Sequence, residues 1–215
     1  MAEVLLKTEE LTKSFGGLVA IQELSMEVEA GEIHAVIGPN GAGKTTLIAQ
    51  LSGSLKTDSG RILFENQEIT HVPEYRRSAL GLARSFQITS VLKNFSALDN
   101  VALAVQAHAG HSFRFWSKAR KAQELREPAL EILEKIGLTD RMDMPASSLS
   151  HGEQRQLELA MALATRPKLL LLDEPMAGMG VEESQKMVEL LLDLKGTHTL
   201  AVSYTHLRAH ETDSY

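Results

Sequence analysis

The chain has 215 residues, of which 43 % are hydrophobic and 23 % are charged, and it contains no cysteine. This length allows one large domain with a core that needs no disulfides, and the missing thiols exclude thiolate metal sites and cysteine nucleophiles. The formal net charge of −6 argues against a general nucleic-acid-binding surface, which is usually basic. No apolar run approaches the ~18 residues that span a bilayer, and the acidic start does not resemble a secretory signal, so we expect a cytosolic or peripheral protein.

The first strong pattern is the segment GEIHAVIGPNG, in which residues 33–37 predict a strand that runs into a glycine-rich turn. A helical pattern follows from about Gly43 and stops by Gly53. The segment GRILFENQEI, residues 60–69, contains β-type residues and predicts a further strand and a turn. The order strand, glycine-rich turn, helix is typical of a phosphate-binding unit.

Helical patterns dominate residues 90–150, in SALDNVALAV and then in WSKARKAQELREPALEILEKIGL. Pro128 predicts the first turn of a helix, because proline is tolerated where no N–H partner is needed, and Gly137 predicts its exit. We therefore expect a helical subdomain inserted in an α/β domain.

The segment GEQRQLELAMALATRP predicts a helix that ends before Pro167, and KLLLLDEP predicts a short strand directly after it. Four leucines without alternation indicate a strand that is covered on both faces, as in a parallel sheet. A helix over residues 182–194 and a strand that starts at HTLAV complete the pattern. Alternating strands and helices predict an α/β fold with a mostly parallel sheet, whose ligands lie at the carboxyl ends of the strands.

The segment GPNGAGKTT matches the phosphate-loop pattern G-x-x-x-x-G-K-[ST]. Glycines let backbone N–H groups turn toward an anion, Lys44 adds a full positive charge, and the Thr45 hydroxyl is the expected ligand of Mg²⁺. A plain glycine-rich turn before a helix is the alternative. The predicted nucleotide-binding residues are Gly38, Pro39, Asn40, Gly41, Ala42, Gly43, Lys44, Thr45 and Thr46.

Asp173 and Glu174 close the leucine strand, where both can reach a nucleotide. We expect Asp173 to hold Mg²⁺ through water, and Glu174 to orient or deprotonate the attacking water, with Lys44 as its catalytic partner on the phosphates. The alternative is a polar stop to a buried strand.

The segment LSHGEQRQ, residues 149–156, together with the phosphate loop and the acidic strand, resembles the signature motif of ABC-type ATPases, usually LSGGQ. His151 replaces the first glycine of that pattern. The resemblance implies that this helix start contacts ATP bound by a second copy, in a head-to-tail dimer. By itself, the pattern also predicts a capping box at a helix start. The residues carried over are Ser150, Gly152, Glu153 and Gln154.

Three further positions follow from the same resemblance. Phe15 resembles the aromatic residue that stacks on adenine, with a core phenylalanine as the alternative. Gln87 resembles the glutamine that contacts Mg²⁺ and senses the γ-phosphate, with a surface glutamine as the alternative. Gly180 departs from the family, which usually has Asp or Asn there to bridge the two subunits.

The resemblance implies the ABC ATPase fold, a phosphate-loop NTPase with a mostly parallel sheet, an N-terminal antiparallel β portion and an inserted helical subdomain. We expect one domain over residues 1–201, with an ATPase core at 1–89 and 151–201 and the helical subdomain at 90–150. ATP and Mg²⁺ are the implied ligands.

The segments FGGLVAI, ARSFQ, SFRFW and EPMAGM resemble the longer ATP-binding subunit of branched-chain amino acid uptake systems. This resemblance implies membrane permease subunits that dock near residues 87–95, a second ATPase subunit, and indirectly a periplasmic binding protein, at the cytoplasmic side of a bacterial inner membrane. ATPases for urea uptake or lipopolysaccharide export are alternatives. A soluble ABC ATPase acting on DNA or ribosomes and a small-molecule kinase are less consistent with one cassette, no heptad arm and a signature motif.

The segment VSYTHLRAHET, residues 202–212, departs from the family pattern. Its back-translation resembles a transposon-type sequencing adapter read in frame, so we expect the native sequence to stop near Ala201 and residues 202–215 to be a non-native tail. In the family, a histidine at the end of this strand contacts the γ-phosphate, and His206 lies one residue out of register for that role. The fold would then be C-terminally truncated, with an open sheet edge and weak hydrolysis.

Overall fold

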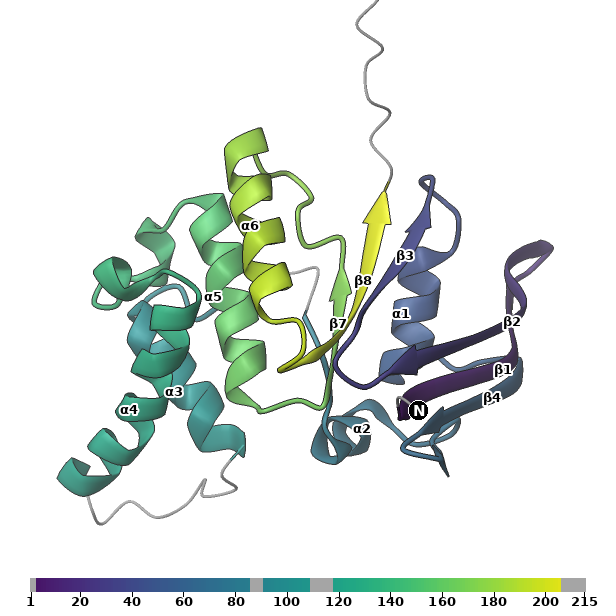
Figure 1. Ribbon diagram of the computed structural model, residues 1–215, viewed down its shortest axis with the longest axis horizontal. Helices are drawn as coiled ribbons and strands as arrows, with labels where there is room; N and C mark the ends of the chain where they lie inside the picture. The colour runs from purple at the N-terminus through teal and green to yellow at the C-terminus, as the bar shows by residue number, and fades with distance from the viewer. Residues whose placement is uncertain (1–2, 86–90, 109–117, 206–215) are drawn as a thin grey trace, which may run out of the picture.

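The computed structural model describes residues 3–85, 91–108 and 118–205. Figure 1 shows an antiparallel sheet on the right, a parallel sheet in the centre and a group of helices on the left. Two hydrophobic clusters support these parts, one under the antiparallel sheet and one between the parallel sheet and the helices. Of the helices described, none has the length and apolar character needed to cross a bilayer.

The N-terminal part is an antiparallel sheet with the strand order β2-β1-β4-β5. Its long first pair is joined by a tight turn at Gly16, whose φ of 59° favours glycine. The antiparallel portion implied by the family resemblance is therefore confirmed. The strands are β1 (Val4–Phe15), β2 (Leu18–Glu29), β4 (Ser59–Phe64) and β5 (Gln67–Glu68).

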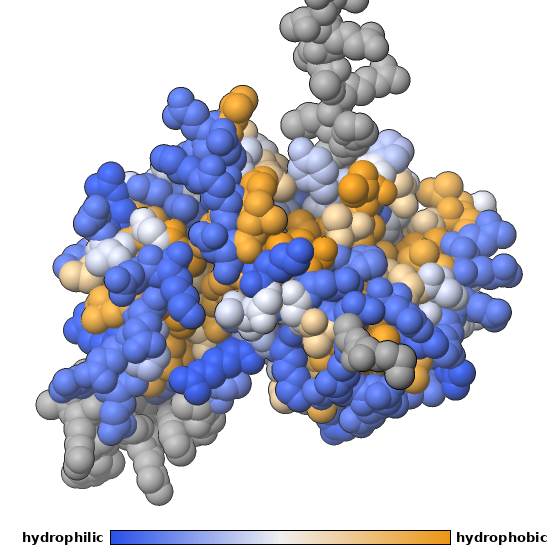
Figure 2. All heavy atoms as spheres, viewed as in Figure 1, coloured by the Kyte–Doolittle hydropathy of each residue, from blue (hydrophilic) through white to orange (hydrophobic). Residues whose placement is uncertain are grey.

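The central sheet is parallel, with the order β3-β8-β7-β6. β3 and β6 are the outer strands of this sheet among the described residues. Figure 2 shows apolar side chains at the surface over this region and over the neighbouring helix α6 (Val181–Asp193). The strands are β3 (Ile33–Gly38), β6 (Leu82–Arg84), β7 (Leu169–Asp173) and β8 (Thr199–Thr205).

β7 confirms the prediction of a strand covered on both faces, because all five of its residues are buried. Leu170 and Leu172 pack into the cluster that contains α5 (His151–Ala164) and α6. Leu169 and Leu171 pack on the opposite face, in the cluster that contains α1 (Lys44–Ser52). Successive side chains of a strand point to opposite faces, so an all-leucine strand serves both cores at once.

The predicted helical region contains α3 (Ala97–His108) and α4 (Lys118–Lys135), which pack near α5, while α2 (Glu74–Leu80) precedes β6. Two short 3₁₀ turns, Thr139–Arg141 and Ala146–Ser148, lead to α5.

The prediction that Pro128 begins a helix is wrong, because Pro128 lies inside α4. Proline removes one backbone hydrogen bond from a helix interior, but the fully buried Ala129 and Leu133 anchor this helix to the core across that gap. The predicted helix exit is confirmed at Gly137, which has a φ of 73°.

The last described strand continues past the predicted boundary at Ala201. β8 runs to Thr205, where it pairs with Gly38 of β3, and Ser203 is fully buried. Residues 202–205 therefore belong to the folded sheet, whatever their origin. His206 lies outside the described residues.

Candidate functional site

The predicted phosphate loop connects β3 to α1 and packs against the antiparallel sheet. Gly41 and Gly43 have φ angles of 82° and 83°, in the left-handed region that favours glycine. A Cβ atom at Gly43 would lie 2.3 Å from the carbonyl oxygen of Ala20 in β2. Glycine at position 43 is thus required twice, by its backbone conformation and by the close approach of β2.

Lys44 is buried at the centre of this loop. Its Nζ atom donates hydrogen bonds to the carbonyl oxygens of Gly38 and Pro39, each at 2.9 Å, and lies 3.5 Å from Oε1 of Glu174. The loop therefore holds a full positive charge next to the start of α1, whose first turn contains no acidic residue. Helix starts and ammonium groups both attract anions, so this end of the sheet can hold a phosphate.

The opposite end of α1 is fixed by Arg77 of α2. Its guanidinium donates hydrogen bonds to the carbonyl oxygens of Gln50 and Leu51, in the last turn of α1, and to those of Thr70 and Val72. Burial lowers the pKa of Arg77 to about 10, which leaves the group positively charged at neutral pH. A cation at a helix carboxyl end is favourable, and here it anchors the helix that carries the loop.

Asp173 lies at the end of β7 with a fully buried side chain. Its Oδ1 atom accepts hydrogen bonds from Thr45 Oγ1 at 3.2 Å and from Ser203 Oγ at 2.8 Å. Its Oδ2 atom lies 3.3 Å from Nη2 of Arg84. Two of the three side chains predicted to serve Mg²⁺, Thr45 and Asp173, therefore meet although they are far apart in the sequence.

The oxygen atoms of Thr45 and Asp173 are suitable ligands for Mg²⁺. They are hard oxygen atoms, one hydroxyl and one carboxylate, of the kind that Mg²⁺ prefers. Among the described residues there is no group of three or more His, Cys, Asp or Glu side chains that could hold a metal ion. Magnesium bound here would complete its coordination with phosphate oxygens and water, as it usually does.

Glu174 follows Asp173 in a left-handed backbone conformation, with a φ of 48°. Its N–H donates a hydrogen bond of 2.9 Å to Ser203 Oγ, while its carboxylate is partly exposed next to Lys44. Non-glycine residues in this conformation are uncommon and are over-represented at functional sites. The backbone thus turns Glu174 away from the buried strand, and toward the phosphate loop.

The predicted signature segment begins α5 and forms the expected capping box. Ser150 Oγ accepts a hydrogen bond from Glu153 N–H at 3.2 Å, and Glu153 Oε2 accepts one from Ser150 N–H at 2.8 Å. The hydrogen bond from Ser150 N–H, aided by Arg141, lowers the pKa of the Glu153 carboxyl. The contact of Ser150, Gly152, Glu153 and Gln154 with ATP stays a prediction.

A carboxylate of the same chain lies at this helix start. Glu183 Oε1 is 3.5 Å from Ser150 Oγ, and a Cβ atom at Gly152 would lie 2.7 Å from that carboxylate. Glu183 Oε2 also accepts a hydrogen bond of 3.3 Å from the N–H of Gly180, the residue just before α6. The glycine at position 152 leaves the space that this carboxylate fills.

Phe15 ends β1 and is 49 % exposed, so the alternative of a core phenylalanine is wrong. Lys13 Nζ lies 5.5 Å from the centre of its ring. An exposed ring is available for stacking, and its stacking on adenine stays a prediction. Gln87 lies outside the described residues.

Two residues at the site were missed by sequence reasoning, Arg84 and Ser203. Arg84 belongs to the segment ARSFQ that drew attention to Gln87, and a charged residue at the end of a short strand was a usable signal. Ser203 was assigned to the non-native tail. Both reach Asp173 from strands next to β7, and no motif indicates such contacts.

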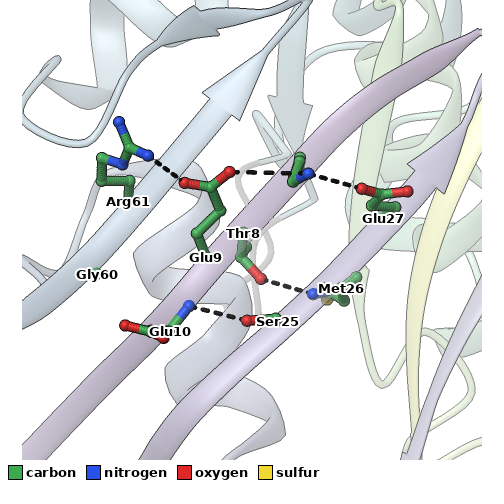
Figure 3. A pocket seen from close by; sticks show the side chains of 9 residues that line it. Thr8, Glu9, Glu10, Ser25, Met26, Glu27, Gly60 and Arg61 are labelled. Carbon is green, nitrogen blue, oxygen red and sulfur yellow. Dashed lines mark hydrogen bonds and ion pairs between the residues drawn. The ribbon is translucent and has the colours of Figure 1, made fainter.

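Away from the phosphate loop, a hollow of ≈ 870 Å³ lies over the antiparallel sheet, and most of the residues that line it are polar (Figure 3). Lys7 pairs with Glu27 at 2.9 Å and with Glu9 at 3.7 Å, and Arg61 pairs with Glu9. The Ser25 hydroxyl accepts a hydrogen bond from the N–H of Glu10. These charges satisfy one another on the sheet, so nothing there indicates a phosphate ligand.

The carboxyl edge of the parallel sheet is therefore the candidate site. A strand, a glycine-rich loop and a helix bring a buried lysine to within ion-pair distance of a carboxylate that follows the leucine strand β7, which β8 separates from β3. This arrangement defines the class of phosphate-loop nucleotide-binding proteins.

Comparison with known proteins identifies the family. The family model described as ABC transporter matches residues 21–177, and the chain belongs to this family. It is an ATPase domain of the ABC type.

Relatives and solved structures agree with this assignment. A probable branched-chain amino acid transport ATP-binding protein LivG of Archaeoglobus fulgidus is 39 % identical over 193 residues, which are 89 % of this chain and 75 % of the relative. The high-affinity branched-chain amino acid transport ATP-binding protein BraF of Pseudomonas aeruginosa is 34 % identical over 94 % of this chain and 81 % of its own. The structure of MJ1267, an ATP-binding cassette of an ABC transporter, superposes with a TM-score of 0.82 at 33 % identity, over 95 % of this chain and 82 % of that one.

Proposed function

We propose that the chain is the ATP-hydrolysing subunit of an importer for branched-chain amino acids. The observation that carries this proposal is the meeting of Thr45 with Asp173, and of Lys44 with Glu174, at one edge of the sheet. Relatives named for branched-chain amino acid transport support the choice of solute. The protein would act at the cytoplasmic side of a bacterial inner membrane.

Each residue has a role in this proposal. The loop from Gly38 to Thr46 binds the phosphates of ATP, and Phe15 stacks on the adenine. Thr45, Asp173 and Gln87 hold Mg²⁺, which neutralises charge on the phosphates when it is bound. Glu174 accepts a proton from the attacking water, since its carboxylate is partly exposed next to Lys44.

A second ATPase subunit completes the site. The start of α5, with Ser150, Gly152, Glu153 and Gln154, would close over ATP that the other subunit holds, in a homodimer or a heterodimer. The helical subdomain at residues 90–150 would move relative to the core when this dimer closes. The position of Ser150 as the N-cap of α5 supports this arrangement, because helix starts attract anions.

The membrane permease subunits need a docking surface, and a groove of ≈ 690 Å³ is available between α2, β6, α3 and α5. Tyr75 of α2, Ala104 of α3 and Met161 of α5 give it a mostly apolar lining. The groove also includes Ser85, just before the predicted docking segment at residues 87–95. A periplasmic binding protein would take part only through the permeases.

Uptake and phosphate release test this function together. The chain, expressed with branched-chain permeases and a binding protein in cells that lack their own ATPase subunit, should restore leucine uptake. Glu174→Gln should abolish uptake and lower the release of phosphate by about 10²–10⁴-fold while ATP still binds. Glu182→Gln, an exposed carboxylate on α6, is the matched control and should behave as the unaltered chain.

Several outcomes would contradict the proposal. Restored urea uptake or lipopolysaccharide export without leucine uptake would show that the transported solute is not a branched-chain amino acid. Transfer of phosphate to an acceptor molecule, in place of phosphate release, would indicate a kinase. ATPase activity that responds to DNA or ribosomes would indicate the soluble class.

A further inference from the structure

Arg84 lies between the candidate magnesium site and the groove, and the proposed function gives it no role. It ends β6, the strand that pairs with β7, and its backbone lies opposite Leu171. Its guanidinium reaches Asp173 at 3.3 Å, and the same residue lines the groove. One arginine therefore touches both features.

The contacts of this guanidinium are incomplete. Nη1 donates to Ser54 Oγ at 3.0 Å and lies 3.5 Å from Ser52 Oγ, at the end of α1. Nε is buried and has no hydrogen-bond partner among the described residues. Only 13 % of the side chain is exposed. Asp173 is the charged partner among the described contacts of this guanidinium, and hydrogen bonds between charged groups are stronger than those to neutral hydroxyls.

Asp173 needs such a counter-ion. Its side chain is fully buried, and its other described partners are the neutral hydroxyls of Thr45 and Ser203. A buried carboxylate without a neighbouring positive charge is strongly unfavourable. In the chain by itself, Arg84 supplies that charge.

Magnesium would bring a second positive charge to the same carboxylate. Two cations next to one carboxylate repel each other, and this repulsion is stronger in a buried site than in water. The guanidinium must then share Asp173 or turn away, and the groove beside it provides the space.

We propose that Arg84 is a positioning residue that serves as the counter-ion of Asp173 and sets the magnesium concentration at which the site fills. This inference depends on the proposed role of Asp173 as a magnesium-binding carboxylate. The inference predicts opposite effects on stability and on magnesium affinity, which a purely structural role of Arg84 would not produce. Removing the charge at position 84 destabilises the metal-free protein but strengthens magnesium binding.

The experiment measures the binding of a fluorescent ATP analogue to the full chain at increasing Mg²⁺ concentration, with thermal unfolding of the metal-free protein alongside. Arg84→Gln should lower the half-saturating Mg²⁺ concentration by about tenfold, an order-of-magnitude value for one charge near a divalent ion in a partly screened site. It should also lower the unfolding temperature. Arg84→Lys keeps the charge, but its single ammonium group cannot contact Ser54 and Asp173 through separate nitrogen atoms as the guanidinium does. Its half-saturating Mg²⁺ concentration should therefore lie between those of Arg84→Gln and the unaltered chain.

Arg126→Gln is the control, because Arg126 forms an arginine–aspartate pair with Asp99 at 3.4 Å on the surface. It should leave the magnesium dependence unchanged. An unchanged or higher half-saturating Mg²⁺ concentration in Arg84→Gln would overturn the inference. If Arg84→Gln does not fold, an Arg84→Lys value equal to or above that of the unaltered chain would overturn it in the same way.

Failure of the underlying function has a different signature. If Asp173→Asn leaves the magnesium dependence of nucleotide binding unchanged, Asp173 does not bind magnesium and the proposed role of the site is wrong. If Asp173→Asn changes it and Arg84→Gln does not, the role of Asp173 stands and the inference about Arg84 is wrong.

Discussion

The starts of α1 and α5 are both predicted to face phosphate, but they differ in how far side chains of the same chain already cap them. Gly43, the residue before α1, is in a left-handed conformation, and no described side chain caps this helix. Ser150, the residue before α5, forms a complete capping box, and the Glu183 carboxylate lies against Ser150. The first start leaves its N–H groups to a ligand, whereas the second is already satisfied within the single chain.

This difference indicates how the two starts would engage ATP. The loop before α1 and the buried Lys44 already form a positively charged cradle, so we expect a single chain to bind nucleotide there. The start of α5 has a carboxylate nearby, which repels phosphate. A second subunit's nucleotide would therefore bind at α5 only with enough favourable contact to offset that repulsion.

The largest effect is expected from adding a side chain at the start of α1. Gly43→Ala places a Cβ atom 2.3 Å from Ala20 O in a left-handed conformation, so the free energy of unfolding should fall by about 3 kcal/mol. Gly41→Ala has the same backbone strain without a neighbour within 4 Å and should lose only about 1 kcal/mol. Urea denaturation measures both. Equal losses would mean that the contact with β2 does not shape the loop.

Removing the charge of the α1 cradle should weaken nucleotide binding. Lys44→Ala should reduce ATP affinity by about 10- to 150-fold, which corresponds to the loss of one charged hydrogen-bonding group, measured by calorimetry. Lys56→Ala, at an exposed lysine just beyond α1, serves as the control. If Lys44→Ala kept its affinity for ATP, the positive charge at the start of α1 would not explain why nucleotide binds there and not at α5.

The cap of α5 should matter for stability more than for nucleotide binding by the single chain. Ser150→Ala removes the side chain that accepts from Glu153 N–H, so unfolding should become easier by about 1 kcal/mol. ATP affinity of the isolated chain should not change. A loss of affinity would show that α5 already touches nucleotide within one chain.

The same cap predicts a dependence on pH. The hydrogen bond from Ser150 N–H lowers the pKa of Glu153, so this carboxylate stabilises the fold above its ordinary pKa, and that stabilisation is lost as pH falls through the lowered value. The stability difference between the unaltered chain and Glu153→Gln should therefore be present at pH 7 and shrink below about pH 4.5. It should stay under about 1 kcal/mol, since the group is partly exposed to solvent and its ion pair with Arg141 lies at the surface. A difference that grows in acid would contradict this assignment.

The smallest effect is expected at Glu183. Glu183→Gln removes the charge next to Ser150 and keeps the side-chain length, so ATP-dependent pairing of two chains should become about twofold stronger. Glu182→Gln, which is exposed in the same first turn, controls for the change in helix-dipole interaction. Light scattering at increasing protein concentration measures the pairing. Weaker pairing in Glu183→Gln would indicate that the carboxylate supports the closed dimer.

Much of the fold could be predicted because its signals are local. The glycine-rich loop, the all-leucine strand and the capping box each depend on residues that are close in the sequence. Pro128 shows the limit of such reasoning, since propensity places it at a helix start, whereas the buried Ala129 and Leu133 keep it inside α4.

By itself, the sequence determined which loop joins a strand to a helix with the phosphate-loop pattern, which strand is buried on both faces, and to which family the chain belongs. Only the tertiary structure decided what surrounds Asp173, because Arg84 and Ser203 come from the two strands beside β7. It also decided that Glu183 lies at the start of α5. The physical reason is that a side chain's charge neighbours depend on strand order and helix placement, which local periodicity does not specify.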